Sequence, residues 1–189
     1  MEKIVIATKN EGKVGEMREA LSHLPVEVVS LRAFGDLPDA VEDGKTFLEN
    51  AKAKAAFYEK RTGCICMADD SGLEVEALGG APGGLSARIV PGPDQARNDW
   101  LLSRLEGRLD RRARFVAALA LAIPDRWTLI SEGECLGRIA TAPEGKGGFG
   151  YDPLFLPDGM SASFAAIPPR MKNAISHRAA ALRNLLEIL

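Results

Sequence analysis

Apolar and polar positions recur with two different periods along the chain, and these periods predict strands that alternate with helices. A short β-branched run over residues 3–7 predicts a first strand. After it, apolar residues recur between Val14 and Leu24 at a spacing near 3.6, which predicts an amphipathic helix. A second short strand is predicted at 26–29. The beginning of the chain therefore has the order of a parallel crossover unit.

Two helices in the middle of the chain have recognisable ends. The stretch Thr46-Phe47-Leu48-Glu49 matches a capping box, so a helix should begin there and end near Gly63. The same match makes Glu49 a capping carboxylate rather than a ligand. A later helix is predicted over residues 93–105, with Gly107 closing it.

The remaining pattern completes an α/β fold. Two apolar runs, 113–123 and 127–132, predict paired buried strands joined by a turn, and residues 72–78 alternate as a half-exposed strand would. A final helix is predicted from Lys172 to Leu189. Early crossovers and a late hairpin imply a mixed central β-sheet flanked by helices, and we expect two lobes with a cleft between them.

Length and charge narrow the class of protein. A chain of 189 residues that is 46% hydrophobic can bury a large core, so we expect residues 1–189 to form a single domain. The formal net charge is −2, and no basic block is longer than Arg111-Arg112. An extended surface for nucleic acid is therefore disfavoured, although a local basic pocket is not.

The cysteines and the first residues indicate a cytoplasmic protein. Three cysteines are an odd number, and Cys64 and Cys66 lack the usual spacing of zinc ligands, so reduced core thiols are favoured. Residues 1–7 run directly into the first strand pattern without a basic leader or an apolar signal region. No run of 18 apolar residues occurs, so we expect no membrane partner.

An apolar run stops at two adjacent carboxylates, Asp69 and Asp70, which Ser71 and Gly72 follow. Neighbouring carboxylates repel each other and are costly to bury unless a cation, a hydrogen-bond network or water compensates them. A strand that ends here would present acids to a cleft. A solvated turn is the alternative, because Asp, Ser and Gly are all good turn residues.

The loop after the first strand has the character of an anion site. It contains Thr8, Lys9, Asn10, Glu11, Gly12 and Lys13 and opens the first predicted helix. Free backbone N–H groups and the positive end of the helix dipole suit a phosphate there. A cation such as Lys13 is unfavourable at a helix N-terminus unless an anion is present, so its position also favours a phosphate. The loop is not a Walker motif.

A glycine-rich loop near residue 150 invites a misleading interpretation. Residues 145–150 satisfy G-x-G-x-x-G, but they neither follow the first strand nor open a helix, so a dinucleotide fold is disfavoured. The loop instead presents Phe149, Gly150, Tyr151 and Asp152, with aromatic faces suited to a base. Further along, three basic groups suggest an anion or a purine edge, namely Lys172, His177 and Arg178.

These motifs, taken in order, resemble the inosine/xanthosine triphosphate pyrophosphatase family over essentially the whole chain. The matching blocks are 7–13, 46–51, 68–73, 79–83, 86–88, 148–153 and 176–180. The most specific are Asp-Asp-Ser-Gly-Leu and Gly-Phe-Gly-Tyr-Asp-Pro. The resemblance implies a homodimeric, Mg²⁺-dependent enzyme that cleaves ITP, dITP and XTP to the monophosphate and pyrophosphate, and so cleans the nucleotide pool.

The resemblance also implies roles for individual residues. Asp70 would be the catalytic acid and a metal ligand, and Ser71 would contact the substrate. Glu42 is chosen as the second metal ligand, although Asp43 beside it is the alternative because the acids before Gly44 depart from the family pattern. The phosphate loop would be Thr8 to Lys13, and the base pocket would comprise Phe149, Gly150, Tyr151, Asp152, Lys172, His177 and Arg178.

A purine nucleoside triphosphate is thus the expected partner, and Mg²⁺ is the expected cofactor because it prefers carboxylate and phosphate oxygens. Asp70 would orient or deprotonate the water that attacks the α-phosphorus. A module that binds a nucleotide without cleaving it is the rival interpretation. The Asp pair argues against this rival, since carboxylates beside a triphosphate weaken binding unless they hold metal or do chemistry. A septum-inhibition-type nucleotide pyrophosphatase is a second rival, but its motifs do not appear in the chain.

Overall fold

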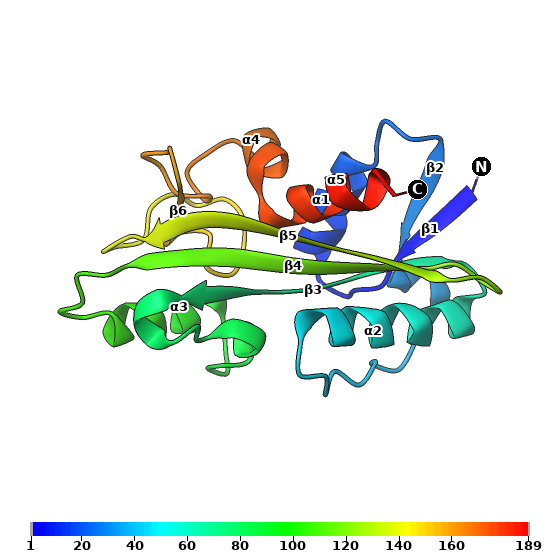
Figure 1. The fold of residues 1–189 in the computed structure, drawn as a ribbon, viewed down its shortest axis with the longest axis horizontal. Coiled ribbons are helices and arrows are strands. Elements are labelled where there is room, and N and C mark those ends of the chain that lie inside the picture. The colour runs from blue at the N-terminus through cyan, green and yellow to red at the C-terminus, as the bar shows by residue number, and fades with distance from the viewer. Residues whose placement is uncertain (1, 189) are drawn as a thin grey trace. The chain divides into compact units, whose positions relative to one another are not determined.

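Strands and helices alternate from β1 to β4 as the hydropathy pattern predicts, and β5, β6, α4 and α5 follow (Figure 1). A computed structural model describes residues 2–188, so Met1 and the predicted apolar position Leu189 lie outside the described range. The elements are β1 Glu2–Ile6, α1 Glu11–Ala20, β2 Val26–Ser30, α2 Phe47–Thr62, β3 Ile65–Val75, α3 Asp94–Arg104, β4 Arg112–Ala122, β5 Thr128–Ile139, β6 Phe155–Pro157, α4 Pro169–Ile175 and α5 His177–Leu186.

The strands form one mixed sheet. Within residues 2–188 the strand order is β2-β1-β3-β4-β5-β6. Strand β1 is parallel to both β2 and β3, with Val5 opposite Val29 on one side and Cys66 on the other. Strand β6 runs antiparallel to β5. The predicted α/β class and the mixed sheet are therefore confirmed.

The chain divides into two compact units. Unit 1 comprises residues 2–70, 117–133 and 178–188, and unit 2 comprises residues 71–116 and 134–177. The strands β3, β4 and β5 each contribute residues to both units. That residues 1–189 function as one domain stays a prediction.

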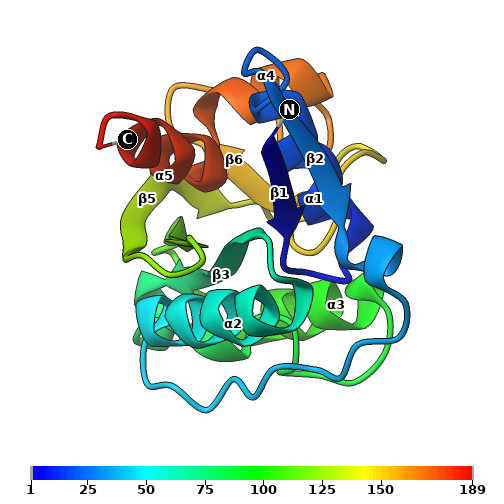
Figure 2. The ribbon, with the colours of Figure 1, turned by 90° about the vertical axis from the view of Figure 1, so that its right-hand side faces the viewer.

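Unit 1 buries both faces of its part of the sheet. Side chains alternate along each strand, so Val5 and Cys66 face one cluster while Ile6 and Met67 face the other. Helix α2 covers the first face, and α1 and α5 cover the second (Figures 1 and 2). On the α2 face, small residues permit a close approach between helix and sheet: Ala51, Ala55, Ala68, Ala118, Ala120 and Ala122.

Unit 2 has its own aromatic core. The rings of Phe115 and Phe155 lie 4.7 Å apart between centroids, and those of Phe155 and Phe164 lie 5.1 Å apart. Leu101 and Leu105 of the α3 region are buried in the same cluster. Offset and tilted ring contacts of this kind add to the stabilisation from apolar burial.

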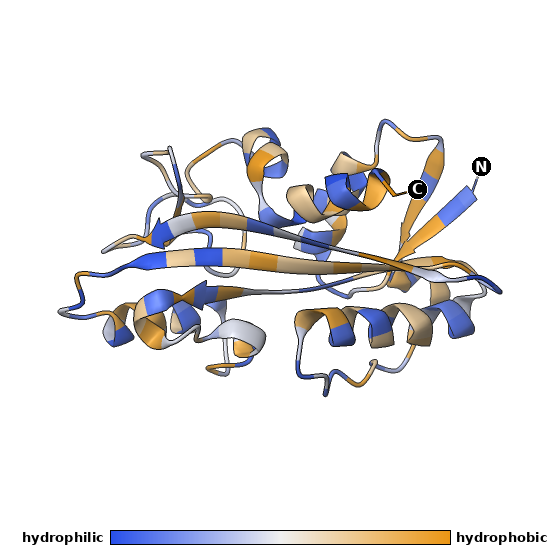
Figure 3. Ribbon diagram, viewed as in Figure 1, coloured by the Kyte–Doolittle hydropathy of each residue, from blue (hydrophilic) through white to orange (hydrophobic). Residues whose placement is uncertain are grey.

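Helix α2 ends as the sequence predicts. The Thr46 hydroxyl accepts a hydrogen bond from the Glu49 N–H at 3.1 Å, and Gly63 has a positive φ of 64°. The Glu49 carboxylate accepts from the Lys45 N–H rather than from that of the N-cap residue. The capping role of Glu49 is therefore confirmed, although the N–H that it binds belongs to the residue before the N-cap residue Thr46. Hydrophilic and hydrophobic patches alternate along the visible side of this helix (Figure 3).

Two predicted boundaries are wrong. Strand β3 runs from Ile65 to Val75 without a break, so the chain neither ends a strand nor turns at Asp69 and Asp70. The strand continues because Asp69 forms ion pairs with Lys13 and Arg178, and these compensate the burial of its carboxylate. The single helix predicted from Lys172 is also wrong, because Ser176 adopts an extended conformation with ψ of 161° and separates α4 from α5.

The cysteines are free thiols. Burial raises the pKa of Cys66 to about 11, and that of Cys135 likewise to about 11, so both stay protonated at neutral pH. Every helix between residues 2 and 188 falls short of the length and apolarity that a bilayer crossing requires.

Candidate active site

The loop between β1 and α1 presents backbone N–H groups at the start of a helix. Asn10 is the N-cap, and its side-chain oxygen accepts from the Lys13 N–H at 3.2 Å. The Thr8 hydroxyl in turn accepts from the Asn10 N–H at 3.1 Å. These bonds fix the loop so that its other N–H groups and the helix dipole are available to an anion.

A cavity of about 220 Å³ opens beside this loop within unit 1. Lys9 at its edge forms an ion pair with Asp39 at 2.8 Å. The Tyr58 hydroxyl, also in the lining, donates to the Pro38 carbonyl at 3.2 Å and so holds the acidic loop that precedes α2. The lining residues are Ala7, Thr8, Lys9, Asn10, Asp39, Ala40, Glu42, Lys54 and Tyr58.

The carboxylate of Asp69 is held between two cations. Its side chain is 2% exposed, with Lys13 Nζ at 2.5 Å from Oδ2 and Arg178 Nε at 3.3 Å from Oδ1. Arg178 also binds Glu16 at 2.7 Å. Two acids and two bases thus balance in charge, which is the condition under which ionised groups tolerate burial. Asp69 therefore acts to fix Lys13 and Arg178.

Burial and neighbours act in opposite directions on these two cations. Burial is the largest influence on Lys13 and lowers its pKa, with Arg178 and Lys54 adding to the effect and Asp69 opposing it. Burial also disfavours charged Arg178, but the attraction of Asp69 and Glu16 outweighs it and raises the pKa of Arg178.

Asp70 has a different environment from its neighbour. Its Oδ2 accepts a hydrogen bond from the Asn50 side-chain N–H at 2.9 Å. Burial raises the pKa of Asp70, and the negative charge of Glu42 raises it further, while Asn50, Lys54 and Lys13 act in the opposite direction. A carboxylate with a raised pKa is a better proton acceptor than an ordinary one, so Asp70 is suited to general-base chemistry.

Asn50 connects Asp70 to the loop that carries Glu42. Its side-chain oxygen accepts from the Gly44 N–H at 2.8 Å, while its amide N–H groups include the donor to Asp70. A Cβ on Gly44 would lie only 2.7 Å from this oxygen and 2.8 Å from the Glu49 Cβ. Glycine is therefore required at position 44 for the loop to approach α2 this closely.

Lys54 completes the charged cluster, and the sequence interpretation missed it. Its ammonium lies 2.9 Å from Glu42 Oε1 and donates to the Asp69 carbonyl at 3.2 Å. The residue is 8% exposed. A signal was present in the sequence, because Asn50, Lys54 and Tyr58 follow one another at four-residue spacing on the buried face of α2.

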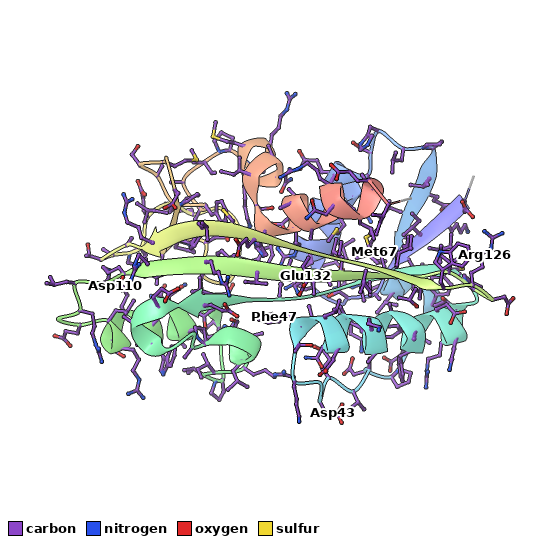
Figure 4. All side chains as sticks on the ribbon, viewed as in Figure 1. Asp43, Phe47, Met67, Asp110, Arg126 and Glu132 are labelled. Carbon is purple, nitrogen blue, oxygen red and sulfur yellow. The ribbon has the colours of Figure 1, made fainter. Side chains whose placement is uncertain are left out.

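Glu42 and Asp70, the two predicted metal ligands, lie in this cluster. Glu42 is partly buried against Lys54, whereas Asp43 is exposed on the outer bend of the loop below α2 (Figure 4). Glu42 and Asp70 offer carboxylate oxygens, the donors that Mg²⁺ prefers, so the residues present fit this ion. Within residues 2–188 no group of three His, Cys, Asp or Glu side chains gathers as a metal site, so phosphate or water oxygens would have to complete the coordination.

The glycine-rich loop of unit 2 is built around Asp152. Its Oδ2 accepts from the Phe149 N–H at 2.9 Å and from Lys172 Nζ at 2.5 Å. The Lys172 ammonium lies 4.6 Å from the Phe149 ring centroid, a cation–π contact. At Gly148, φ is +70° and a Cβ would collide with the Asp152 carboxylate. Lys172, Asp152 and Phe149 are thus brought together as one group.

The other predicted base contacts are placed differently. Tyr151 is 3% exposed and donates to the Ser86 carbonyl at 2.9 Å, so its ring belongs to the core. His177 is 2% exposed and stacks on Phe115 at 4.7 Å. Arg178 joins Asp69 and Glu16 in unit 1. The three predicted basic groups belong to α4 and to the first two residues of α5, and a role for each in base recognition stays a prediction.

Comparison with known proteins gives a consistent match over the whole chain. Residues 4–188 match the profile of the Ham1 family. The chain is 50% identical over 185 residues to a protein of Syntrophobacter fumaroxidans named dITP/XTP pyrophosphatase, covering 96% of this chain and 79% of that protein. A Geobacillus kaustophilus protein of the same name is 50% identical over 192 residues, covering 99% and 94%. The solved structure of a HAM1 protein from Coxiella burnetii is 41% identical with a TM-score of 0.88, covering 100% and 98%.

Proposed function

The chain belongs to the Ham1 family, and on that premise we propose that it is a dITP/XTP pyrophosphatase. It hydrolyses dITP, XTP and ITP to the nucleoside monophosphate and pyrophosphate, and so removes nonstandard purines from the nucleotide pool. The observation that carries this proposal is the full-length identity of about one half to relatives named dITP/XTP pyrophosphatase. The resemblance that the sequence motifs indicate is thereby confirmed at the level of the family.

The charges of unit 1 support a site for a triphosphate. Lys13 and the N-terminus of α1 would neutralise the phosphate groups, with Thr8, Lys9, Asn10, Glu11 and Gly12 supplying loop contacts. Asp69 keeps the Lys13 ammonium in place without allowing it to move into solvent. The substrate phosphates are thus expected to meet a fixed positive charge rather than a mobile one, which lowers the cost of ordering the site.

Asp70 is proposed as the general base. It accepts the proton of a water whose oxygen bonds to the α-phosphorus, while the bond from that phosphorus to the oxygen leading to the β-phosphate breaks. The leaving pyrophosphate takes the bonding electron pair, and Lys13 stabilises the charge that forms there. Ser71, the next residue of β3, is proposed to contact the substrate. Lys54 keeps Glu42 and the Asp69 backbone in position.

Mg²⁺ is the proposed cofactor, with Glu42 and Asp70 as its protein ligands. When bound, it supplies Lewis-acid stabilisation of the triphosphate charge. The side-chain amide of Asn50 bonds both to Asp70 and to Gly44 in the loop of Glu42. It therefore helps to keep the distance between the two carboxylates constant.

Unit 2 is proposed to provide the base contacts. Phe149, Gly150, Tyr151, Asp152, Lys172 and His177 are assigned to it, together with Arg178 of unit 1. Lys172 and Arg178 are donors, and a 6-oxo purine offers an acceptor where adenine offers an amino group, so such a site would discriminate against ATP. A cleft between two lobes, a homodimer, a cytoplasmic location and a single domain over residues 1–189 belong to the same proposal, as does the absence of nucleic-acid and membrane partners.

A panel of nucleotides tests the substrate class. We expect dITP, XTP and ITP to be cleaved with kcat/KM at least about 10²-fold above that for ATP, because donors left unpaired against adenine are penalised. GTP shares the 6-oxo group, so its rejection should be weaker. The measurement is steady-state pyrophosphate release from each nucleotide under the same conditions. Equal kcat/KM for ITP and ATP would contradict the proposal.

A further inference from the structure

Both backbone polar groups of Gly150 are hydrogen-bonded to side chains of helix α3. The N–H donates to Asp94 Oδ2 at 2.6 Å, and the carbonyl accepts from the Asn98 side-chain amide at 3.1 Å. The two residues lie four apart on α3, so one turn of the helix supplies both an acceptor and a donor. Asp94 is itself fixed by an ion pair with Arg97.

We propose that Asn98 and Asp94 are positioning residues that fix the 148–151 loop for base recognition. This inference rests on the proposed function, since it takes Phe149 and its neighbours as base contacts. It adds a role for α3, a helix to which the proposed function assigns no residue.

The loop needs such a support because of its backbone. Gly148 and Gly150 both have positive φ values, of 70° and 63°. Glycine reaches these angles easily, but it also loses the most conformational freedom on ordering. Hydrogen bonds to the Gly150 N–H and to its carbonyl restrict the two peptide groups that join Phe149 to Tyr151, and so favour one orientation of the Phe149 ring.

Helix α3 is held in place by its packing in the core of unit 2. Leu101 and Leu105, one and two turns beyond Asn98, are 0% and 1% exposed in the core of unit 2. Tyr151 and Leu154, which follow the loop, belong to the same core. Both the support and the end of the loop are thus fixed to one packed cluster.

The burial of Asn98 points to a specific function for its side chain. The residue is 3% exposed, and within residues 2–188 its Oδ1 atom has no hydrogen-bond partner. Burying an amide without full hydrogen bonding is unfavourable, and an apolar residue of similar size would fill this position at lower cost. The bond to the Gly150 carbonyl is the contact that an apolar residue could not make.

The test compares Asn98→Leu with wild type for ligands that do and do not carry a base. We expect the Kd of inosine monophosphate and the KM of ITP to rise about tenfold, because a buried Gly150 carbonyl loses its donor. The Kd of inorganic tripolyphosphate should stay unchanged, and kcat for ITP should change less than twofold. A merely structural role would affect both ligands alike. Asp99→Ala, an exposed residue of α3 bonded only to Gln95 among the described contacts, is the matched control and should match wild type throughout.

Amide exchange at Gly150, measured by NMR in the free protein, separates this inference from the proposed function. Faster exchange in Asn98→Leu than in wild type supports the positioning role, and this result does not depend on enzymatic activity. A wild-type protein that releases no pyrophosphate from any nucleotide would instead refute the proposed function. Unchanged exchange together with an unchanged Kd for inosine monophosphate overturns the inference. If Asn98→Leu fails to fold, Asn98→Ala supplies the same comparison, since it removes the donor without adding bulk or charge.

Discussion

Asp70→Asn is expected to lower kcat for dITP by about 10²- to 10⁴-fold, the range typical for loss of a general base. The amide cannot accept the proton of the attacking water, and it removes a negative charge beside Glu42. Binding of the product monophosphate should change little, because the phosphate loop and the 148–151 loop are untouched. The measurement is single-turnover cleavage of dITP at saturating enzyme. Asp43→Asn, at the exposed neighbour of Glu42, is the control and should keep nearly full activity.

The same variant should not lose stability at neutral pH. Burial raises the pKa of Asp70 in the folded state, so the folded protein binds this proton more tightly than the unfolded chain does. Ionised Asp70 therefore costs stability above its folded pKa, and the cost disappears below its unfolded pKa. Asp70→Asn removes this cost, so its Tm at pH 7 should equal or exceed that of wild type. A large fall in kcat accompanied by a large fall in Tm would assign Asp70 a structural role instead.

Arg178→Met is expected to lower the free energy of unfolding by about 3–5 kcal/mol, the usual effect of removing one partner from a buried ionic network. Glu16 would lose its 2.7 Å partner, and Asp69, 2% exposed, would keep only Lys13 of its two described ion pairs. Urea unfolding at pH 7 measures the change. Adding Glu16→Gln to this variant should recover part of the loss, because the partly buried carboxylate that has lost its Arg178 ion pair is then replaced by a neutral amide.

Arg32→Met is the matched control for this experiment. Arg32 pairs with Glu11 at 3.0 Å, but both side chains are more than half exposed, at 72% and 54%. Removing an exposed pair typically costs less than about 1 kcal/mol. If the Arg178 and Arg32 variants were destabilised equally, the network around Asp69 would not be the buried, charge-balanced unit described here.

Local signals in the sequence were sufficient where local forces decide the structure. Helix α2 begins after Thr46 and ends at Gly63, because a side-chain cap and a left-handed residue act within one turn of the helix. The mixed sheet followed from crossovers and a hairpin whose apolar patterns are regular. The glycines near residue 150 do not form a dinucleotide motif, as the sequence predicts, since the next element after them is the strand β6 and not a helix.

Interactions between distant residues explain what the sequence did not predict. The strand continues through Asp69 because Lys13 and Arg178, 56 residues before it and 109 after it, neutralise its carboxylate. The single helix predicted from Lys172 is divided into α4 and α5, because Ser176 adopts an extended conformation that the apolar pattern does not indicate. The sequence does not single out Lys54, because a lysine on a helix is usually solvated and only the fold shows its contact with Glu42.

Hydrolysis of dITP in ¹⁸O-labelled water, with mass analysis of both products, tests the central claim most directly. Attack on the α-phosphorus predicts pyrophosphate without label and deoxyinosine monophosphate that carries one ¹⁸O atom. Formation of deoxyinosine diphosphate and orthophosphate, or label in the pyrophosphate, would contradict the proposed pyrophosphatase reaction.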